Sequence, residues 1–322
     1  MASNEIEILD PTASVGKLKK IAAGHALNRR HFIAALGMTG AAAGAGMMSG
    51  CSTSNSVAVT TTASTAQIDM LNFALNVKYL QATFYSYITQ GKDLTGSAVT
   101  NSPSPTGGPA VLSFAGIAGV TNAQQITDML NEIYYDEKNH VTTLLGLLGV
   151  SAVFRPQINL AGFGTITTTN ALSIARLLED VGVTAYAGII PSLSSSDITL
   201  LGQIMGADSL HAGILRLTAL QNPSIAAYIK ADTLDVAPFD PGAGSSAGPT
   251  SSGGFFATAG ASTASVANPA GFAFTRSISQ AYSILFGTET ATGSTTTVTL
   301  ATVGTTSGGF FPNGVNGNLN RV

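Results

Sequence analysis

Charged residues are scarce in this chain of 322 residues, and some residue types are almost absent. It contains no Trp, one Cys, four His, and 14 Lys and Arg against 17 Asp and Glu. A single Cys excludes an intrachain disulfide. A net charge of −3, with no basic run after the first thirty residues, argues against nucleic acid as a partner. Apolar residues are plentiful instead, so a substantial core can be buried.

The N-terminal segment carries the pattern of an export signal. Arg29 and Arg30 precede Phe32, and an uncharged run of small and apolar residues then covers 33–50. This resembles a bacterial twin-arginine signal, and the Gly content of the run disfavours a permanent transmembrane helix. The alternative is an ordinary internal apolar helix. We assign residues 1–50 to the signal and expect a periplasmic or envelope-anchored protein.

The signal ends in MMSGC, where small residues precede the only Cys. This resembles a lipoprotein processing box, which would make Cys51 the lipidated first residue and a membrane tether. The alternative is cleavage nearby, with Cys51 lost or left as a free thiol. From Cys51 onward nine Lys and Arg face fourteen Asp and Glu, and only His140 and His211 remain of the histidines.

A Ser/Thr-rich flexible tether over 51–66 leads into four predicted helices. A Gly/Pro/Ser-rich stretch separates the first two helices, and a loop of roughly twenty residues separates the middle two. Long connections of this kind suit an all-α four-helix bundle with a crossover, which we assign to residues 67–225. Apolar periodicity and flanking polar and Pro residues place the helices at about 68–90, 123–148, 171–190 and 198–220.

Residues 226–322 form a Gly/Ser/Thr-rich C-terminal extension that we expect to be mostly irregular. One short helix is predicted in FAFTRSISQAYSILFG, and the β-branched STTTVTLATV is expected to form a strand or a hairpin arm. The tetrapeptide GGFF occurs at 253–256 and 308–311. We interpret its paired Phe residues as anchors that hold the extension on the bundle.

Ionisable residues interrupt the apolar seam of every predicted helix. An unpaired buried charge costs several kcal/mol, so these groups must neutralise one another or hold an ion. Both histidines of the mature chain follow an acid by three positions, and the first two helices look like a diverged copy of the last two. The alternative is two core histidines that local carboxylates satisfy. The seam residues are Lys78 on the first helix, Glu137 and His140 on the second, Glu179 on the third, and Asp208 and His211 on the fourth.

These residues resemble the ferritin-like di-metal carboxylate bundles, in which two helices give one Glu each and the other two give Glu-x-x-His. More narrowly, the motifs LNFALNVKYLQATFY, DEKNHV, LEDVGVTAYAG and FFPNGVNG are similar to those of bacterial ferritin-like proteins related to plant desiccation-related proteins. The resemblance covers about residues 67–220 and, more loosely, the extension. It implies a metal site and an association with desiccation or oxidative stress.

Two positions depart from the family pattern, because Asp208 stands where Glu is usual and Lys78 stands where the first helix normally gives a Glu. A protonated ammonium cannot ligate a metal. Either Lys78 replaces the metals outright in a network with three carboxylates, or it takes one metal's place and leaves a mononuclear site for Fe, Mn or Zn. Tyr85 and Tyr186 on the seams are candidate partners of the ligands. The implied ligands are Glu137, His140, Glu179, Asp208 and His211.

Three functions follow from this reading of the chain. The first is an exported stress protein whose degenerate site binds at most one transition metal ion. The second is a metal-free structural or interaction protein whose core is locked by Lys78 and the carboxylates. The third, which Lys78 disfavours most, is a peroxidase- or catalase-like oxidoreductase. The sequence leaves open whether the protein is an enzyme and whether it forms a homo-oligomer.

Overall fold

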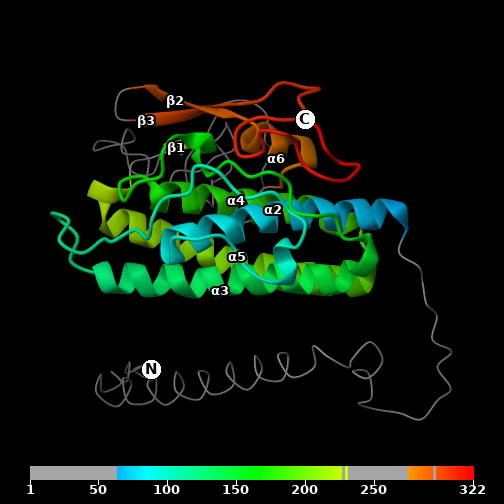
Figure 1. Ribbon diagram of the computed structural model, residues 1–322, viewed down its shortest axis with the longest axis horizontal. Helices are drawn as coiled ribbons and strands as arrows, with labels where there is room; N and C mark the ends of the chain where they lie inside the picture. The colour runs from blue at the N-terminus through cyan, green and yellow to red at the C-terminus, as the bar shows by residue number, and fades with distance from the viewer. Residues whose placement is uncertain (1–63, 227–228, 231–274, 293–294) are drawn as a thin grey trace, which may run out of the picture. The chain divides into compact units, whose positions relative to one another are not determined.

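Four long helices pack together in the computed structural model of the protein, as the sequence predicts (Figure 1). α2 contacts α3 most extensively, α4 contacts α5 most extensively, and α2 also packs against α4. The predicted four-helix bundle is therefore confirmed. The helices are α2 (Thr65–Gln90), α3 (Ala123–Leu148), α4 (Ala171–Ile189) and α5 (Ser195–Gln221).

The structure describes four ranges of the chain, 64–226, 229–230, 275–292 and 295–322, and all belong to the compact unit Thr62–Val322. The predicted signal over 1–50, Cys51 and the first GGFF at 253–256 lie outside the described residues. Among the helices described, none combines the length and the hydrophobicity that a membrane span needs.

Two helices begin earlier than predicted because serine side chains cap them upstream. The Ser64 hydroxyl accepts a hydrogen bond from the backbone N–H of Gln67 (3.3 Å), and the Gln67 side chain accepts one from Ser64 N–H (3.1 Å). This reciprocal cap starts α2 within the last residues assigned to the tether. The Ser194 hydroxyl accepts from Asp197 N–H (3.4 Å), which starts α5 about one turn before the predicted position.

The helices form two layers that differ in burial. Almost every side chain of α4 and most side chains of α2 are buried, whereas α3 and α5 each keep an exposed outer face. α2 and α4 are apolar around most of their circumference, which is the pattern of a helix covered on all sides. The described part of the C-terminal extension lies on the side of α2 and α4 that faces away from α3 (Figure 1).

The connection between α3 and α4 is the predicted crossover. Near its start, Ser151 O accepts a hydrogen bond from the Asn72 side chain of α2 (2.9 Å), and Val153 N–H donates to Asn72 Oδ1 (3.0 Å). Further on, the ring of Phe163 packs against Phe310 of the extension, with 4.5 Å between centroids. The connection thus leaves the layer of α3, passes over α2 and reaches the extension.

The extension contains the predicted short helix, α6 (Ile278–Leu285), and more strand than expected. The β-branched segment forms β3 (Thr295–Thr299), which pairs antiparallel with β2 (Thr288–Thr292) as a hairpin. A third strand, β1 (Ile229–Lys230), pairs parallel with β3, so the strand order is β1-β3-β2. The sequence does not predict this three-stranded sheet. A strand as short as β1 has only two residues and therefore shows no detectable period in the sequence.

The second GGFF is an anchor of the extension, as interpreted from the sequence. Phe310 and Phe311 are both 0% exposed, and Phe311 meets Phe286 edge-on with 6.1 Å between centroids. The backbone N–H of Phe310 donates to Leu285 O (3.0 Å). Gly309 has a φ of +46°, and a Cβ there would lie 2.4 Å from Gly287 O, so only glycine lets the two phenylalanines turn inward.

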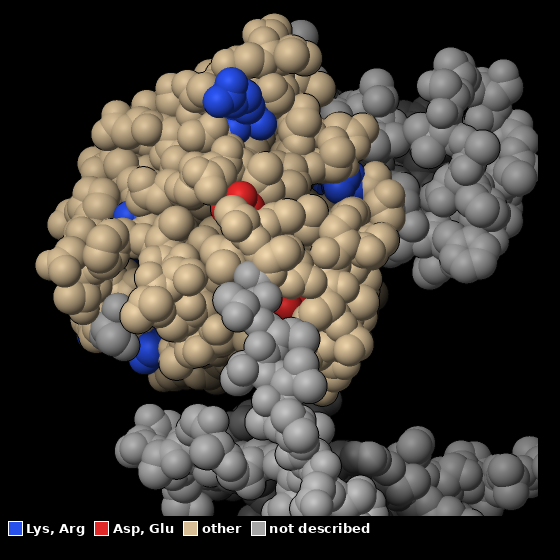
Figure 2. All heavy atoms as spheres, turned by 90° about the vertical axis from the view of Figure 1, so that its right-hand side faces the viewer, with Lys and Arg blue, Asp and Glu red and all other residues tan. Residues whose placement is uncertain are grey.

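Charged side chains are widely spaced on the face of the molecule shown in Figure 2, as the low charge content leads one to expect. Several of the chain's charges are instead buried and paired. The fully buried Arg155 donates to Asp93 Oδ2 (2.9 Å) and to Pro103 O (2.8 Å), and Arg176 donates to Asp180 Oδ2 (2.9 Å). Many of the described ionisable residues are therefore internal, which directs attention to the bundle core.

Candidate metal centre

The bundle core brings together ligand-type side chains from three helices. The ligand atoms of four residues lie within 4.8 Å of one another, and all four residues are buried. α3 supplies one carboxylate, α4 supplies another, and α5 supplies a carboxylate and an imidazole that are three residues apart on one face. Carboxylate and imidazole donors in this mixture suit Fe, Mn or Zn. The four residues, called here the carboxylate cluster, are Glu137, Glu179, Asp208 and His211.

Lys78 of α2 lies inside the carboxylate cluster with its side chain fully buried. Its Nζ is 2.9 and 2.7 Å from the two carboxylate oxygens of Glu137 and 2.7 and 2.6 Å from those of Asp208. Nζ also lies 5.5 Å from the ring centroid of Tyr186, which adds a cation–π contact. The ammonium thus bridges two carboxylates, as a metal ion does when it is shared between them.

The protonation states of Lys78 and of the carboxylates around it depend on burial and on the charges of their neighbours. Burial alone would lower the pKa of Lys78, but the charges of Asp208, Glu137 and Glu179 outweigh burial and raise it, so the ammonium persists. Burial likewise favours neutral Glu137, yet the charges of Lys78 and His140 hold its pKa well below its usual value. Burial and mutual repulsion raise the pKa of Asp208 and of Glu179.

His211 closes the cluster toward the surface between α3 and α5. Its Nδ1 lies 3.3 Å from Glu179 Oε2, and its Nε2 lies 3.2 Å from Asp136 Oδ2. Burial alone would lower its pKa, but hydrogen bonds with Asp136, Glu137 and Glu179 raise the pKa to about 12. With a carboxylate at each ring nitrogen, His211 is an imidazolium that donates in both directions.

Asp136 is a contact that sequence reasoning missed. It directly precedes Glu137 but points toward α5 with 40% of its side chain exposed, so it lies off the apolar seam that located the other residues. The one available signal was the Asp-Glu pair at the start of DEKNH. Asp136 is not one of the four residues of the carboxylate cluster. Its contact with Nε2 of His211 orients the imidazole ring from the solvent side.

His140, a predicted ligand, lies at the rim of the cluster. Its Nδ1 is 3.3 Å from Glu137 Oε1 and 3.6 Å from Asp208 Oδ1, and 14% of its side chain is exposed. The rings of His140 and His211 are 6.5 Å apart between centroids. The structure thus brings four of the five predicted ligands within ligand distance of one another and leaves His140 outside that group. Metal binding by these residues stays a prediction.

The two seam tyrosines lie at the cluster but do not contact it alike. Both hydroxyls are buried, and burial together with the carboxylate charges raises the pKa of Tyr85 and of Tyr186. The Tyr186 hydroxyl lies 3.5 Å from Gln81 Oε1, away from the carboxylates. Neither the Tyr85 hydroxyl nor Glu179 Oε1 has a hydrogen-bond partner within 3.5 Å in the described part of the chain, yet Tyr85 lies near enough to Glu179 for a hydrogen bond with that carboxylate to contribute to the raised pKa of Tyr85.

The unpartnered oxygen of Glu179 is the observation that tests whether the cluster fits a metal ion. A buried carboxylate oxygen without a donor is costly, and native proteins satisfy such atoms with a proton, a water molecule or an ion. Glu179 Oε1 belongs to the same residue group whose ligand atoms lie within 4.8 Å of one another. The donor set therefore fits one cation beside Lys78.

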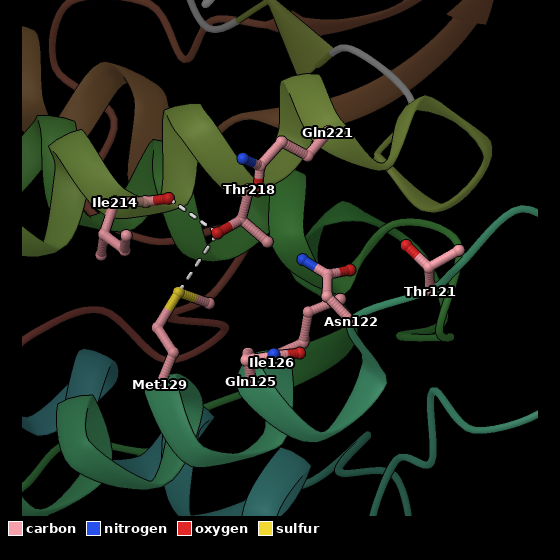
Figure 3. Close-up of a pocket in the computed structure, with 8 residues that line it drawn as sticks. All are labelled: Thr121, Asn122, Gln125, Ile126, Met129, Ile214, Thr218 and Gln221. Carbon is pink, nitrogen blue, oxygen red and sulfur yellow. Dashed lines mark hydrogen bonds between the residues drawn. The ribbon is translucent and has the colours of Figure 1, made fainter. Parts of the chain in front are cut away.

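A separate hollow of about 530 Å³ opens between the start of α3 and the end of α5 (Figure 3). The Thr218 hydroxyl donates to Ile214 O (2.8 Å) and lies 3.4 Å from Met129 Sδ. Thr218 is two helical turns beyond His211, roughly 10 Å along α5. None of the residues that line the hollow is charged, so the candidate site is the carboxylate cluster and not this hollow. The lining residues of the hollow are Thr121, Asn122, Gln125, Ile126, Met129, Ile214, Thr218 and Gln221.

Comparison with known families agrees with this geometry. Residues 66–221, which include all but the first residue of the four bundle helices, match the family model of the ferritin-like domain. No curated protein matches the chain. The match and the four packed helices confirm a ferritin-like bundle with a buried Glu/Glu/Asp/His cluster that could bind metal.

The first prediction concerns Lys78. Lys78→Met removes the buried cation and leaves Glu137 and Asp208 facing each other, so we expect the metal-free protein to lose about 3–5 kcal/mol of unfolding free energy in urea. Lys138→Met, a matched change at a partly exposed position of α3, should alter it by less than about 0.5 kcal/mol. A Lys78→Met effect as small as the control would show that the network does not stabilise the bundle.

The second prediction concerns pH. The pKa of His211 in the folded, metal-free protein is raised to about 12, above the ordinary unfolded value of about 6.5. Its contribution to stability is therefore complete below about pH 6.5 and declines as the pH rises toward 12. The difference in unfolding free energy between wild type and His211→Gln should shrink steadily from pH 6 to pH 9. A ring of His211 that loses its proton near pH 6.5 by NMR would contradict this.

Proposed function

We propose that this ferritin-like domain binds one transition metal ion, Fe, Mn or Zn, while Lys78 occupies the place of a second. Glu179 and His211 would be the main ligands, with Glu137 shared between the ion and the ammonium. The observation that carries the proposal is the buried Glu179 carboxylate, which has one unpartnered oxygen, Oε1, and belongs to four residues whose ligand atoms lie within 4.8 Å of one another. A bound ion would supply Lewis-acid or one-electron chemistry at this position.

The surrounding residues define what such a site can do. The single charge of Lys78 can balance only one of its two carboxylate partners, Glu137 and Asp208, so an incoming ion would meet the remaining negative charge of these residues together with Glu179 and the outer Asp136. His211 can ligate only after it releases the proton that it shares with Glu179 or with Asp136. His211 would therefore give up a proton when a metal ion binds, and the partly exposed Asp136 is the carboxylate at Nε2 that could receive it.

A second candidate function is a metal-free structural bundle, and a different observation favours it. Both buried cations already have their hydrogen-bonding partners, because Lys78 faces four carboxylate oxygens and His211 has a carboxylate at each ring nitrogen. Such a network holds four helices in register without any ion. In this case the surface of the bundle, and not its core, would carry the function.

We also propose that the protein is exported and tethered to the bacterial envelope and that it acts under desiccation or oxidative stress. Support for export comes from Arg29, Arg30 and the apolar run over 33–50, and support for the tether comes from MMSGC before Cys51. The stress role is supported by the resemblance to desiccation-related proteins alone. The Ser/Thr-rich sequence between Cys51 and the Ser64 cap of α2 has the composition of a linker between such an anchor and the bundle.

The third prediction is a metal stoichiometry. Protein purified from its native compartment should contain about one equivalent of Fe, Mn or Zn by elemental analysis, and His211→Ala or Glu179→Gln should remove it. Lys78→Glu restores the residue usual in the family and should raise the content toward two equivalents. Glu132→Gln, at an exposed acid of α3, is the control and should leave it unchanged.

The outcomes separate the two candidate functions. Absence of metal from every preparation, together with no gain for Lys78→Glu, would exclude the one-metal site and favour the structural bundle. Metal that survives His211→Ala would place the ion elsewhere in the chain.

The fourth prediction concerns export. The double variant Arg29→Lys, Arg30→Lys should accumulate in the cytoplasm, because the twin-arginine pair is the part of such a signal that its receptor reads. Cells that carry it should lose whatever protection against drying or peroxide the wild-type protein gives. Unchanged fractionation would refute the export proposal, and unchanged survival would refute the stress role.

A further inference from the structure

The outer face of α5 is apolar where a solvated helix would be polar. Leu210, Leu217 and Leu220 are 70%, 47% and 39% exposed. They belong to a row whose steps alternate between four and three residues, the spacing that presents one stripe of a helix to a neighbouring helix. We call this row the outer seam of α5, and its members are Thr199, Gln203, Gly206, Leu210, Gly213, Leu217 and Leu220.

The outer seam carries no charge, and α3 shows that this is unusual within the same bundle. The exposed face of α3 includes Asp128 and Glu132, which is the ordinary pattern of a helix facing water. On α5 the acids Asp197 and Asp208 are buried, and Arg216 is held by Asp180. α5 therefore has its ionisable groups on the inside and an uncharged apolar row on the outside, which is typical of an interaction surface.

The two glycines of the outer seam point to close approach by another backbone. Glycine is a poor helix former, and both lie well inside α5. A Cβ at Gly206 or at Gly213 would meet nothing within 4 Å, so packing among the described residues does not require glycine at either position. Small residues beside large ones on one helix face form the holes and knobs of helix pairing.

We propose that the outer seam of α5 binds the same seam of a second copy of this chain, with the two helices antiparallel. A two-fold axis between positions 211 and 212 sets Leu210 opposite Gly213 of the other copy, and Gly213 opposite Leu210. The same axis sets Leu217 opposite Gly206. Each large side chain thus meets a glycine, which is the self-complementarity that an isologous interface requires.

Charge favours a second copy as the occupant, and the available area limits how tightly it can bind. Two uncharged seams meet without burying an unpaired charge, which costs heavily at an interface. The 27 residues of α5 extend over about 40 Å, and a strip about 11 Å wide gives roughly 450 Å² per copy. The total of roughly 900 Å² is close to the lower limit of about 1,000 Å² for specific interfaces, so the dimer should be weak and reversible.

The outer seam is independent of the carboxylate cluster. Asp208 lies on the opposite side of α5 from Leu210, and the side chains of both Asp208 and His211 are buried in the bundle. Dimerisation is therefore tested without metal, and its failure would leave the proposed metal site untouched.

The fifth prediction uses sedimentation velocity of the full chain from about 1 to about 200 µM. We expect a monomer–dimer equilibrium with a dissociation constant in this range. Leu210→Asp should raise the constant at least tenfold. Tyr135→Asp is the matched control, because it adds the same charge at a 56% exposed position of α3 and should change nothing.

Gly213→Leu tests the register. It fills the hole opposite Leu210, and a Cβ at this position would meet no atom within 4 Å, so the melting temperature of the monomer should stay the same or rise while the dimer weakens at least tenfold. Tighter association of Gly213→Leu would indicate general hydrophobic clustering and overturn the proposal. A monomer at every concentration would also overturn it, whether a segment of the same chain or another protein covers the seam. A dimer that survives Leu210→Asp would have a different interface.

Discussion

The bundle depends on one buried interaction, the bridge that Lys78 makes between Glu137 and Asp208. Its Nζ lies 2.6–2.9 Å from four carboxylate oxygens at a point where no water reaches any of the three side chains. The bridge joins α2 to α3 and α5, and the pKa values of the remaining groups follow from its charge. The ammonium of Lys78 therefore supplies part of the positive charge that metal ions usually provide between the carboxylates of a ferritin-like bundle.

Sequence reasoning located this core well, because each group in it interrupts an apolar seam. Lys78, Glu137, Glu179 and Asp208 were found by that one criterion, and all are 0% exposed. Two things were beyond its reach. Asp136 lies off the seam, and its contact with His211 depends on how closely α3 approaches α5, which no periodicity encodes. For the same reason His140, which fits the seam, lies at the rim instead.

The extension was harder to predict than the bundle, since its order comes from contacts distant in sequence. Its helix and hairpin had local patterns, but β1 is a pair of residues that becomes a strand only beside β3. Phe310 and Phe311 could be recognised as anchors because buried aromatic pairs stand out in a polar segment. Where they insert, against Phe163 and Phe286, follows only from the fold.

The contacts of the C-terminal residues with α2 also set an order of events during synthesis. Asn76 donates to Asn316 O (2.7 Å) and Asn318 donates to Asp69 Oδ1 (2.9 Å), contacts between residues 240 and 249 positions apart. This side of α2 is therefore covered only after Asn316 and Asn318 have been synthesised. Pairings across such separations form slowly, because closing so long a loop costs entropy before the contact stabilises anything.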